Sequence, residues 1–131
     1  MTEEKKKPYG DPMTFPFWEA AQQHRLLIQH CPACGAHQFY PRPFCLACNS
    51  TELEWVEVKG EATIRSMTTV HLQIVPYLVP PYVVAVIELD EGPRMLGNVE
   101  GGSPAIGDRI RLAWRERTDA PPLPTWVSLE T

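Results

Sequence analysis

Hydrophobic and polar residues alternate over much of the second half of the chain, and this pattern predicts β-strands. Every second residue of segment 61–71 is small or apolar, namely Ala62, Ile64, Ser66, Thr68 and Val70. A period of two places such residues on one face of a half-buried strand. Residues 109–115 alternate in the same way, with Ile110, Leu112 and Trp114 on the apolar face.

Two more strands are expected between these segments. Residues 82–89 are apolar at almost every position, which is typical of a central strand covered on both faces. Residues 94–99 follow across a turn at 90–93. The strands differ in length, a bend is expected at Gly60, and no helical crossover is expected. These features favour a small closed barrel, and an OB-fold best suits this chain length.

The first half of the chain predicts a short helix followed by a strand. Thr14 is a candidate N-cap, Pro16 falls in the first turn, and good helix formers continue to Arg25. Trp18 and Ala21 would lie on the buried face of this helix. Residues 26–30 then form a strand that leads into the first cysteine. Because the chain contains 14 prolines, long helices are not expected.

Composition and charge narrow the class of protein. The 131 residues suffice for one compact domain, and 12 basic against 16 acidic residues give a net charge of -4. No apolar run approaches the ~20 residues of a membrane-spanning helix, and no apolar stretch follows the N-terminal lysines as a secretory signal requires. We therefore expect a soluble cytoplasmic protein with no membrane partner. In a reducing compartment, cysteines favour metal binding over disulfides.

The four cysteines form two CxxC pairs, Cys31, Cys34, Cys45 and Cys48. Two thiolates three positions apart converge on one ion from a tight turn, and a second turn completes a tetrahedron. Gly35 and Asn49, one after each pair, tolerate the left-handed backbone conformation that aims amides at the sulfurs. The spacing predicts a structural zinc site, with all four cysteines as ligands.

Four cysteines can also serve chemistry other than a structural zinc site. An iron centre has the same four-sulfur ligand set, so electron transfer stays open on spacing alone. A catalytic zinc is not expected, because four cysteines close the coordination shell. A thioredoxin-type redox pair would leave the second CxxC unexplained. No spare cysteine and no serine elbow remain, so we expect the chain alone to be non-catalytic.

Short motifs follow one another along nearly the whole chain: Phe17-Trp18-Glu19, Cys31-Pro32-Ala33-Cys34-Gly35, Tyr40-Pro41-Arg42, Trp55 with Gly60, Thr69-Val70-His71, Pro81-Tyr82-Val83-Val84-Ala85, Glu88-Leu89-Asp90-Glu91-Gly92 and Leu123-Pro124. In this order and spacing they resemble the zinc-ribbon OB-fold proteins that accompany thiolases and related acyl-CoA enzymes. The resemblance implies a mostly β protein with an N-terminal helical segment, a rubredoxin-like zinc ribbon and a C-terminal OB-fold barrel.

The resemblance also implies a function. It indicates a non-catalytic accessory subunit of an acyl-CoA-processing complex, which docks on a thiolase-like or hydratase-like partner and helps to form the acyl-CoA site. A thiolase-like partner is the main hypothesis. We therefore expect a hetero-oligomer, with structural Zn²⁺ in this chain and CoA or acyl-CoA at the interface. The expected units are a tail and helical segment (1–30), the ribbon (31–50), the OB-fold (51–117) and an extended C-terminal tail (118–131).

Residues 73–81 form the candidate docking surface. The segment is apolar and stiffened by Pro76, Pro80 and Pro81, so it cannot pair as a central strand. We predict that it faces the partner, with His71 beside it and three apolar anchors, Ile74, Tyr77 and Leu78. The alternative, that the segment folds back over the barrel as core, stays open at this point.

A row of basic residues lies near the end of the chain, at Arg109, Arg111, Arg115 and Arg117. The row is either a solvated strand edge or a contact for the phosphates of one CoA, and Arg109 and Arg111 are the candidate CoA contacts. The rival function is single-stranded nucleic-acid binding, which zinc ribbons and OB-folds also serve. The net charge of -4, and about two further negative charges from a four-thiolate zinc site, oppose it. We therefore expect no nucleic-acid partner.

Overall fold

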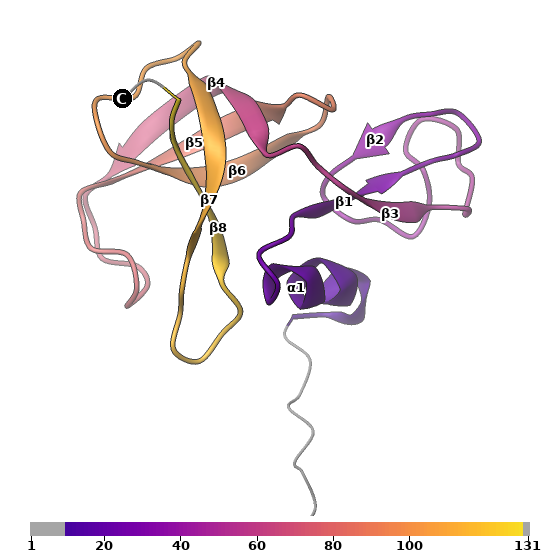
Figure 1. The fold of residues 1–131 in the computed structure, drawn as a ribbon, viewed down its shortest axis with the longest axis horizontal. Coiled ribbons are helices and arrows are strands. Elements are labelled where there is room, and N and C mark those ends of the chain that lie inside the picture. Colours follow the sequence, from indigo (N-terminus) through magenta and orange to yellow (C-terminus); the bar gives the residue numbers. More distant parts are fainter. Residues whose placement is uncertain (1–9, 130–131) are drawn as a thin grey trace, which may run out of the picture.

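The computed structural model describes residues 10–129. A short 3-10 helix, η1 (Pro12–Thr14), leads into α1 (Phe15–Ala21), and three strands form the ribbon sheet: β1 (Leu27–His30), β2 (His37–Gln38) and β3 (Glu54–Glu57). The remaining strands form a closed barrel: β4 (Glu61–Val70), β5 (Tyr82–Leu89), β6 (Arg94–Glu100), β7 (Arg109–Arg115) and β8 (Leu123–Ser128). Figure 1 shows the ribbon sheet beside the barrel, with α1 beneath. The predicted fold class is confirmed.

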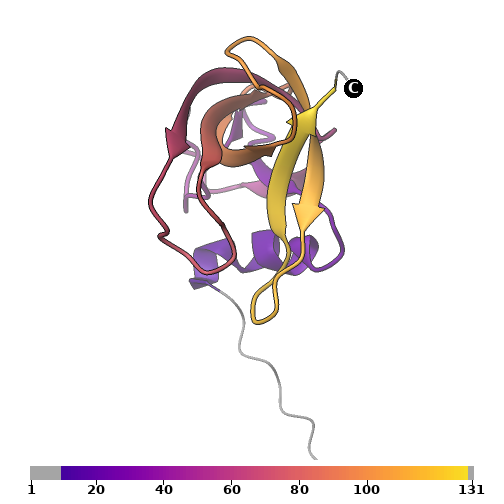
Figure 2. The ribbon, with the colours of Figure 1, turned by 90° about the vertical axis from the view of Figure 1, so that its left-hand side faces the viewer.

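The barrel closes in the order β4, β5, β6, β8, β7, and β7 pairs back onto β4. Its strands curve around a common interior in Figure 2. All neighbours are antiparallel except β6 and β8, which run parallel and pair at only three positions, residues 98–100 with 125–127. The C-terminal segment expected as an extended tail thus contains the strand that closes the barrel. No helix within residues 10–129 is long and apolar enough to cross a bilayer.

Strand β4 departs from the predicted alternation at its middle. Its pairing with β5 shifts register between Ile64 and Ser66, which leaves Arg65 as an extra residue. Such a bulge reverses the side-chain parity of everything that follows. Ala62 and Ile64 are buried as expected, but Ser66 and Thr68 are exposed and Met67 packs against the core instead. The alternation of apolar and polar residues in the sequence does not reveal a bulge at Arg65.

Helix α1 joins the ribbon to the barrel. The helix ends at Ala21, earlier than the segment to Arg25 that the sequence suggested, and His24 then adopts a left-handed conformation with φ of 56°. Ala21 is buried as predicted, Trp18 is half-buried, and Phe17 reaches the core. One hydrophobic cluster contains Phe17 together with Leu26, Ile28 and the inward residues of the barrel. The ribbon and barrel therefore share a core and pack as one body.

The interior of the barrel is organised around Trp126 on β8, whose side chain is fully buried. Its ring lies against the backbone of Gly97 on β6, where a Cβ atom would meet two ring atoms at 2.7 and 2.8 Å. Real Cβ contacts are essentially never this short. A glycine at position 97 is therefore required for the ring to lie across β6.

This close approach predicts that Gly97→Ala destabilises the protein. The new methyl group must displace a fully buried ring, and overpacking of this kind costs about 1–3 kcal/mol. Urea unfolding of the zinc-loaded chain measures the loss. Leu96→Ala, at the neighbouring exposed position, is the control and should change the free energy of unfolding by less than about 0.5 kcal/mol. Equal stability of Gly97→Ala and the wild type would contradict the contact.

Candidate functional site: a four-cysteine metal centre

The two CxxC segments fold into similar turns. In the first, the Gly35 amide donates to the Cys31 carbonyl at 2.7 Å and the Cys31 amide donates to the Ala36 carbonyl at 2.8 Å. The second repeats this pattern between residues 45, 49 and 50 at 2.8 Å for both bonds. Gly35 and Asn49 have φ of 82° and 65°. The left-handed conformation predicted for these two residues is confirmed.

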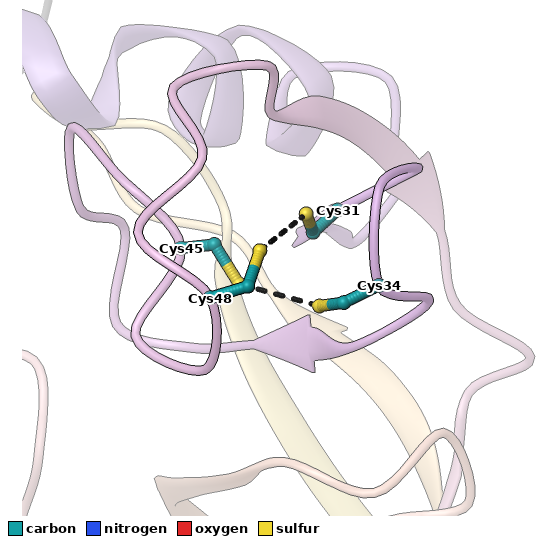
Figure 3. A group of neighbouring side chains, drawn as sticks. All are labelled: Cys31, Cys34, Cys45 and Cys48. Atoms are coloured by element: carbon teal, nitrogen blue, oxygen red, sulfur yellow. Dashed lines mark hydrogen bonds between the residues drawn. The ribbon is translucent and has the colours of Figure 1, made fainter.

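The turns bring all four sulfur atoms together, as Figure 3 shows. The four Sγ atoms lie within 4.8 Å of one another, and the pairs Cys31–Cys48 and Cys34–Cys45 are 3.6 Å apart. A tetrahedral zinc ion with Zn–S bonds of about 2.3 Å requires S–S separations near 3.8 Å. One cysteine of each turn is buried and the other exposed. The donor set and its spacing fit one structural zinc ion with a closed shell.

Backbone amides prepare the sulfurs for a cation. The amide of Cys34 is the largest influence on Cys31 and lowers the pKa of its thiol. Burial raises the pKa of Cys45, but the amides of Cys48 and Ala47 outweigh it, and the pKa falls to about 7. At Cys48, the Ser50 amide lowers the pKa, yet the neighbouring thiols and burial raise it to about 12. The backbone amides therefore stabilise some of the thiolates, whereas four neighbouring thiolates repel one another. A divalent cation between them would remove this repulsion.

Two buried glutamines hold the ribbon around this centre. The Gln29 side chain donates to the Arg42 carbonyl at 2.9 Å and accepts from the Arg42 amide at 2.8 Å. Gln38 donates to the side chain of Gln29 at 2.9 Å and accepts from the Leu46 amide at 3.0 Å. Both glutamines are almost fully buried. The loop between the two cysteine turns is therefore fixed by side-chain amides, which take the place of a strand partner.

Sequence reasoning missed this pair of glutamines. The available signal was weak: Gln29 follows two apolar residues in β1, and Gln38 precedes Phe39 at the end of the two-residue strand β2. Only the antiparallel pairing of the two strands, which sets residue 29 opposite residue 38, brings the two side chains into contact.

The segment predicted to face a partner lies in the β4–β5 loop, residues 71–81. Ile74 is 66% exposed and Tyr77 is 36% exposed, whereas Leu78 is 9% exposed and points into the protein. His71 is exposed at the end of β4. Two apolar residues outside the predicted anchors, Leu72 and Val79, are more exposed than any of these. The loop thus presents an apolar surface to solvent, and the buried side chain of Leu78 anchors it to the rest of the protein.

The predicted arginine contacts differ in their surroundings. Arg109 donates to both carboxylate oxygens of Asp90, at 2.6 and 2.9 Å, and further contacts Glu61 and Thr63. This pairing, chiefly the hydrogen bonds from Arg109, lowers the pKa of Asp90. Arg111 is exposed, and its side chain forms no ion pair with residues 10–129. Of the two residues, Arg111 has the more available cation.

The metal centre yields a prediction for Cys34→Ser. Zinc binding in sites of this kind supplies folding free energy on the order of 10 kcal/mol, so loss of one ligand should leave the chain insoluble or unfolded. The measurements are zinc content by elemental analysis, with one zinc per chain expected for the wild type, and circular dichroism. Ala33→Ser places a hydroxyl in the same turn without removing a ligand and should behave as the wild type. Stoichiometric iron in place of zinc, or a folded Cys34→Ser chain, would contradict the prediction.

Comparison with known proteins places these features in a family. The ChsH2 rubredoxin-like zinc ribbon domain matches residues 18–54, and the ChsH2 C-terminal OB-fold domain matches residues 55–115. The chain is 39% identical over 114 residues to a probable enoyl-CoA hydratase alpha subunit of Thermomonospora curvata, covering 84% of this chain and 36% of that protein. It thus spans about a third of the length of that relative.

Two further similarities cover most of both chains. A DUF35 domain-containing scaffold protein of Methanocaldococcus jannaschii is 30% identical over 111 residues, which cover 80% of this chain and 79% of that protein. The solved structure titled Ltp2-ChsH2(DUF35) aldolase contains a chain with 34% identity and a TM-score of 0.82, covering 93% of this chain and 98% of that chain. The chain therefore belongs to the DUF35 family, and it joins a rubredoxin-like zinc ribbon of the ChsH2 type to a C-terminal OB-fold domain.

Proposed function

We propose that this chain is a non-catalytic accessory subunit that docks on an acyl-CoA enzyme, stabilises it and helps to form its acyl-CoA site. Relatives carry names of the same kind: a hydratase alpha subunit, a scaffold protein, and a member of an aldolase complex. All four cysteines of the chain belong to the metal centre, so no thiol is left to act as a nucleophile. The catalytic groups therefore come from the partner.

The observation that carries this proposal is the apolar surface of the β4–β5 loop. Four large apolar side chains are exposed there, Leu72, Ile74, Tyr77 and Val79. Exposed apolar side chains in such a group are unfavourable in a solvated loop, but they are typical of a protein–protein docking site. Three prolines stiffen the loop, so little conformational entropy is lost when it binds. Tyr77 is further held by the Arg117 guanidinium, 5.1 Å from its ring centre, which also lies over Trp18 of α1.

Within this proposal, the partner is a thiolase-like enzyme, which supplies the nucleophilic cysteine and the bases. The alternative is a hydratase-like or aldolase partner, and identification of the co-purified enzyme distinguishes between them. CoA would lie at the interface, where the exposed Arg111 and His71 are the candidate contacts from this chain. Nucleic-acid binding is not favoured, because the net charge is -4 and Arg109 is already neutralised by acidic neighbours.

Isolation of the tagged chain from its native host tests the proposal directly. We expect a stoichiometric acyl-CoA enzyme to co-purify and to be identified by mass spectrometry. The purified zinc-loaded chain alone should show no thiolysis, hydration or aldol cleavage of acyl-CoA substrates, whereas its addition should raise the activity of the partner. Turnover by the isolated chain, or an unchanged partner, would overturn the assignment.

The docking surface predicts that Ile74→Asp weakens the complex. Truncation or charge at an apolar anchor commonly costs about 2 kcal/mol or more, equivalent to a roughly thirtyfold rise in Kd. Isothermal titration with the co-purified partner measures it. Ile106→Asp is a matched control, because Ile106 is the same residue type with the same 66% exposure, in the β6–β7 loop. Equal effects of the two variants on Kd would show that the loop is not part of the interface.

Tyr77→Ala separates an interface role from a structural one. We expect it to weaken the complex while the zinc content and Tm of the free chain change little, because the Tyr77 side chain is 36% exposed. A loss of stability of about 3 kcal/mol or more in the free chain would instead assign the loop to the core.

A further inference from the structure

A groove of about 620 Å³ lies where α1, the ribbon and the barrel meet. Its walls are mostly apolar, with Phe17 and Trp18 from α1, Tyr40 from the ribbon, and Leu96 and Leu123 from the barrel. Leu96 projects from β6 with 68% of its side chain exposed, although it lies within a regular strand. The volume falls in the range of about 300–1,000 Å³ that is typical of binding sites.

One wall of the groove is an open sheet edge. Strand β6 pairs with β5 along residues 94–99, but with β8 only at residues 98–100. Residues 94–97 line the groove and have no strand partner on that side within the described part of the chain. Because alternate residues of a strand direct their N–H and C=O groups to opposite sides, this edge presents backbone donors and acceptors to the groove.

Two polar side chains in the groove also lack partners. The Arg42 guanidinium forms no ion pair or hydrogen bond with residues 10–129, although the backbone of Arg42 is held in place by Gln29. The side-chain nitrogen of Asn98 is buried and has no hydrogen-bond partner in that same range. By contrast, Arg94 at the rim pairs with Glu88 at 3.2 Å, a carboxylate that it shares with Arg65. Within the described part of the chain, the groove therefore offers one exposed, unpaired cation on a fixed backbone and one unsatisfied donor.

We propose that this groove receives an extended segment of the partner enzyme, which adds to the open edge of β6. The segment carries apolar side chains that cover Leu96 and the aromatic wall, and one acidic side chain that pairs with Arg42. A main-chain carbonyl of the segment accepts from Asn98. This proposal rests on the proposed function, since it takes the acyl-CoA enzyme as the partner.

The charges in the groove favour a polypeptide over CoA itself. Coenzyme A carries a diphosphate and a further phosphate, which call for several cations. Among residues 10–129, the groove has a single unpaired guanidinium, that of Arg42, which matches one carboxylate. Its open strand edge matches a peptide main chain, the arrangement known from β-strand addition, where backbone hydrogen bonds give affinity and side-chain pockets give specificity.

A photo-crosslinker placed at position 96 tests the proposal in the assembled complex. Benzoylphenylalanine replaces Leu96 in one variant and Ile106, which is equally exposed outside the groove, in the other. After illumination of the complex purified from the native host, mass spectrometry identifies what is attached. We expect position 96 to attach to one segment of the partner enzyme, with alternating apolar residues and an acidic residue, and position 106 not to attach to it.

The other outcomes are distinguishable. An adduct with the mass of an acyl-CoA at position 96 would overturn the proposal and make the groove a ligand site. A complex that forms without any crosslink from position 96 would overturn the groove assignment while leaving the accessory function intact. If no acyl-CoA enzyme assembles with the chain, the proposed function is wrong. The proposed occupant of the groove is then wrong as well.

Affinity measurements give an independent readout. Arg42→Glu and Leu96→Asp should each raise the Kd for the partner at least tenfold, whereas Ile106→Asp should leave it unchanged. Arg42→Lys keeps the charge and should retain most of the affinity. The Tm of each free variant should stay close to that of the wild type, because Arg42 and Leu96 are both exposed. A Kd of Arg42→Glu equal to that of the wild type would overturn the proposed ion pair.

Discussion

Four cysteine sulfur atoms lie within 4.8 Å of one another and fit one zinc ion, and we propose that the ribbon depends on this ion for its stability. Its sheet is small, with a two-residue strand β2 and four-residue strands β1 and β3. Few of its side chains are buried, and two of those are the ligands Cys31 and Cys45. Such a unit has too little apolar burial to be stable alone, so the binding free energy of the ion becomes folding free energy.

The rigid ribbon determines where other groups lie. The cysteine turns fix the ends of the loop 35–44, and the two buried glutamines fix its middle, so Arg42 is held at the edge of the groove. Leu26 and Ile28 continue the barrel core into the ribbon, and Phe17 adds α1 to the same cluster. As the proposed accessory subunit, the chain would contribute fixed surfaces to its complex, and a rigid surface binds with a smaller entropic cost.

Charge within the barrel is largely satisfied internally. Glu88 accepts from Arg65 and Arg94, which lower the pKa of its carboxyl group, and Asp90 accepts from Arg109. These cross-strand pairs are partly exposed and contribute little each, but they leave the barrel with few free cations. The surfaces that remain for recognition are therefore mainly apolar, on the β4–β5 loop and in the groove. This balance agrees better with a protein partner than with a polyanion.

The sequence alone determined the features that depend on residues close together in the chain. The two CxxC turns with Gly35 and Asn49, the strand at residues 82–89 and the proline-stiffened loop each follow from local spacing or backbone restriction, and the structure has all of them. The resemblance drawn from the order of short motifs likewise led to the family. Only the tertiary structure decided which face of β4 turns inward after its bulge, that Leu78 is buried while Ile74 is exposed, and that Arg109 pairs with Asp90. It also decided the Gln29–Gln38 contact and the groove. These features join residues from strands that are distant in sequence, and strand register, which no local pattern records, sets which of their side chains meet.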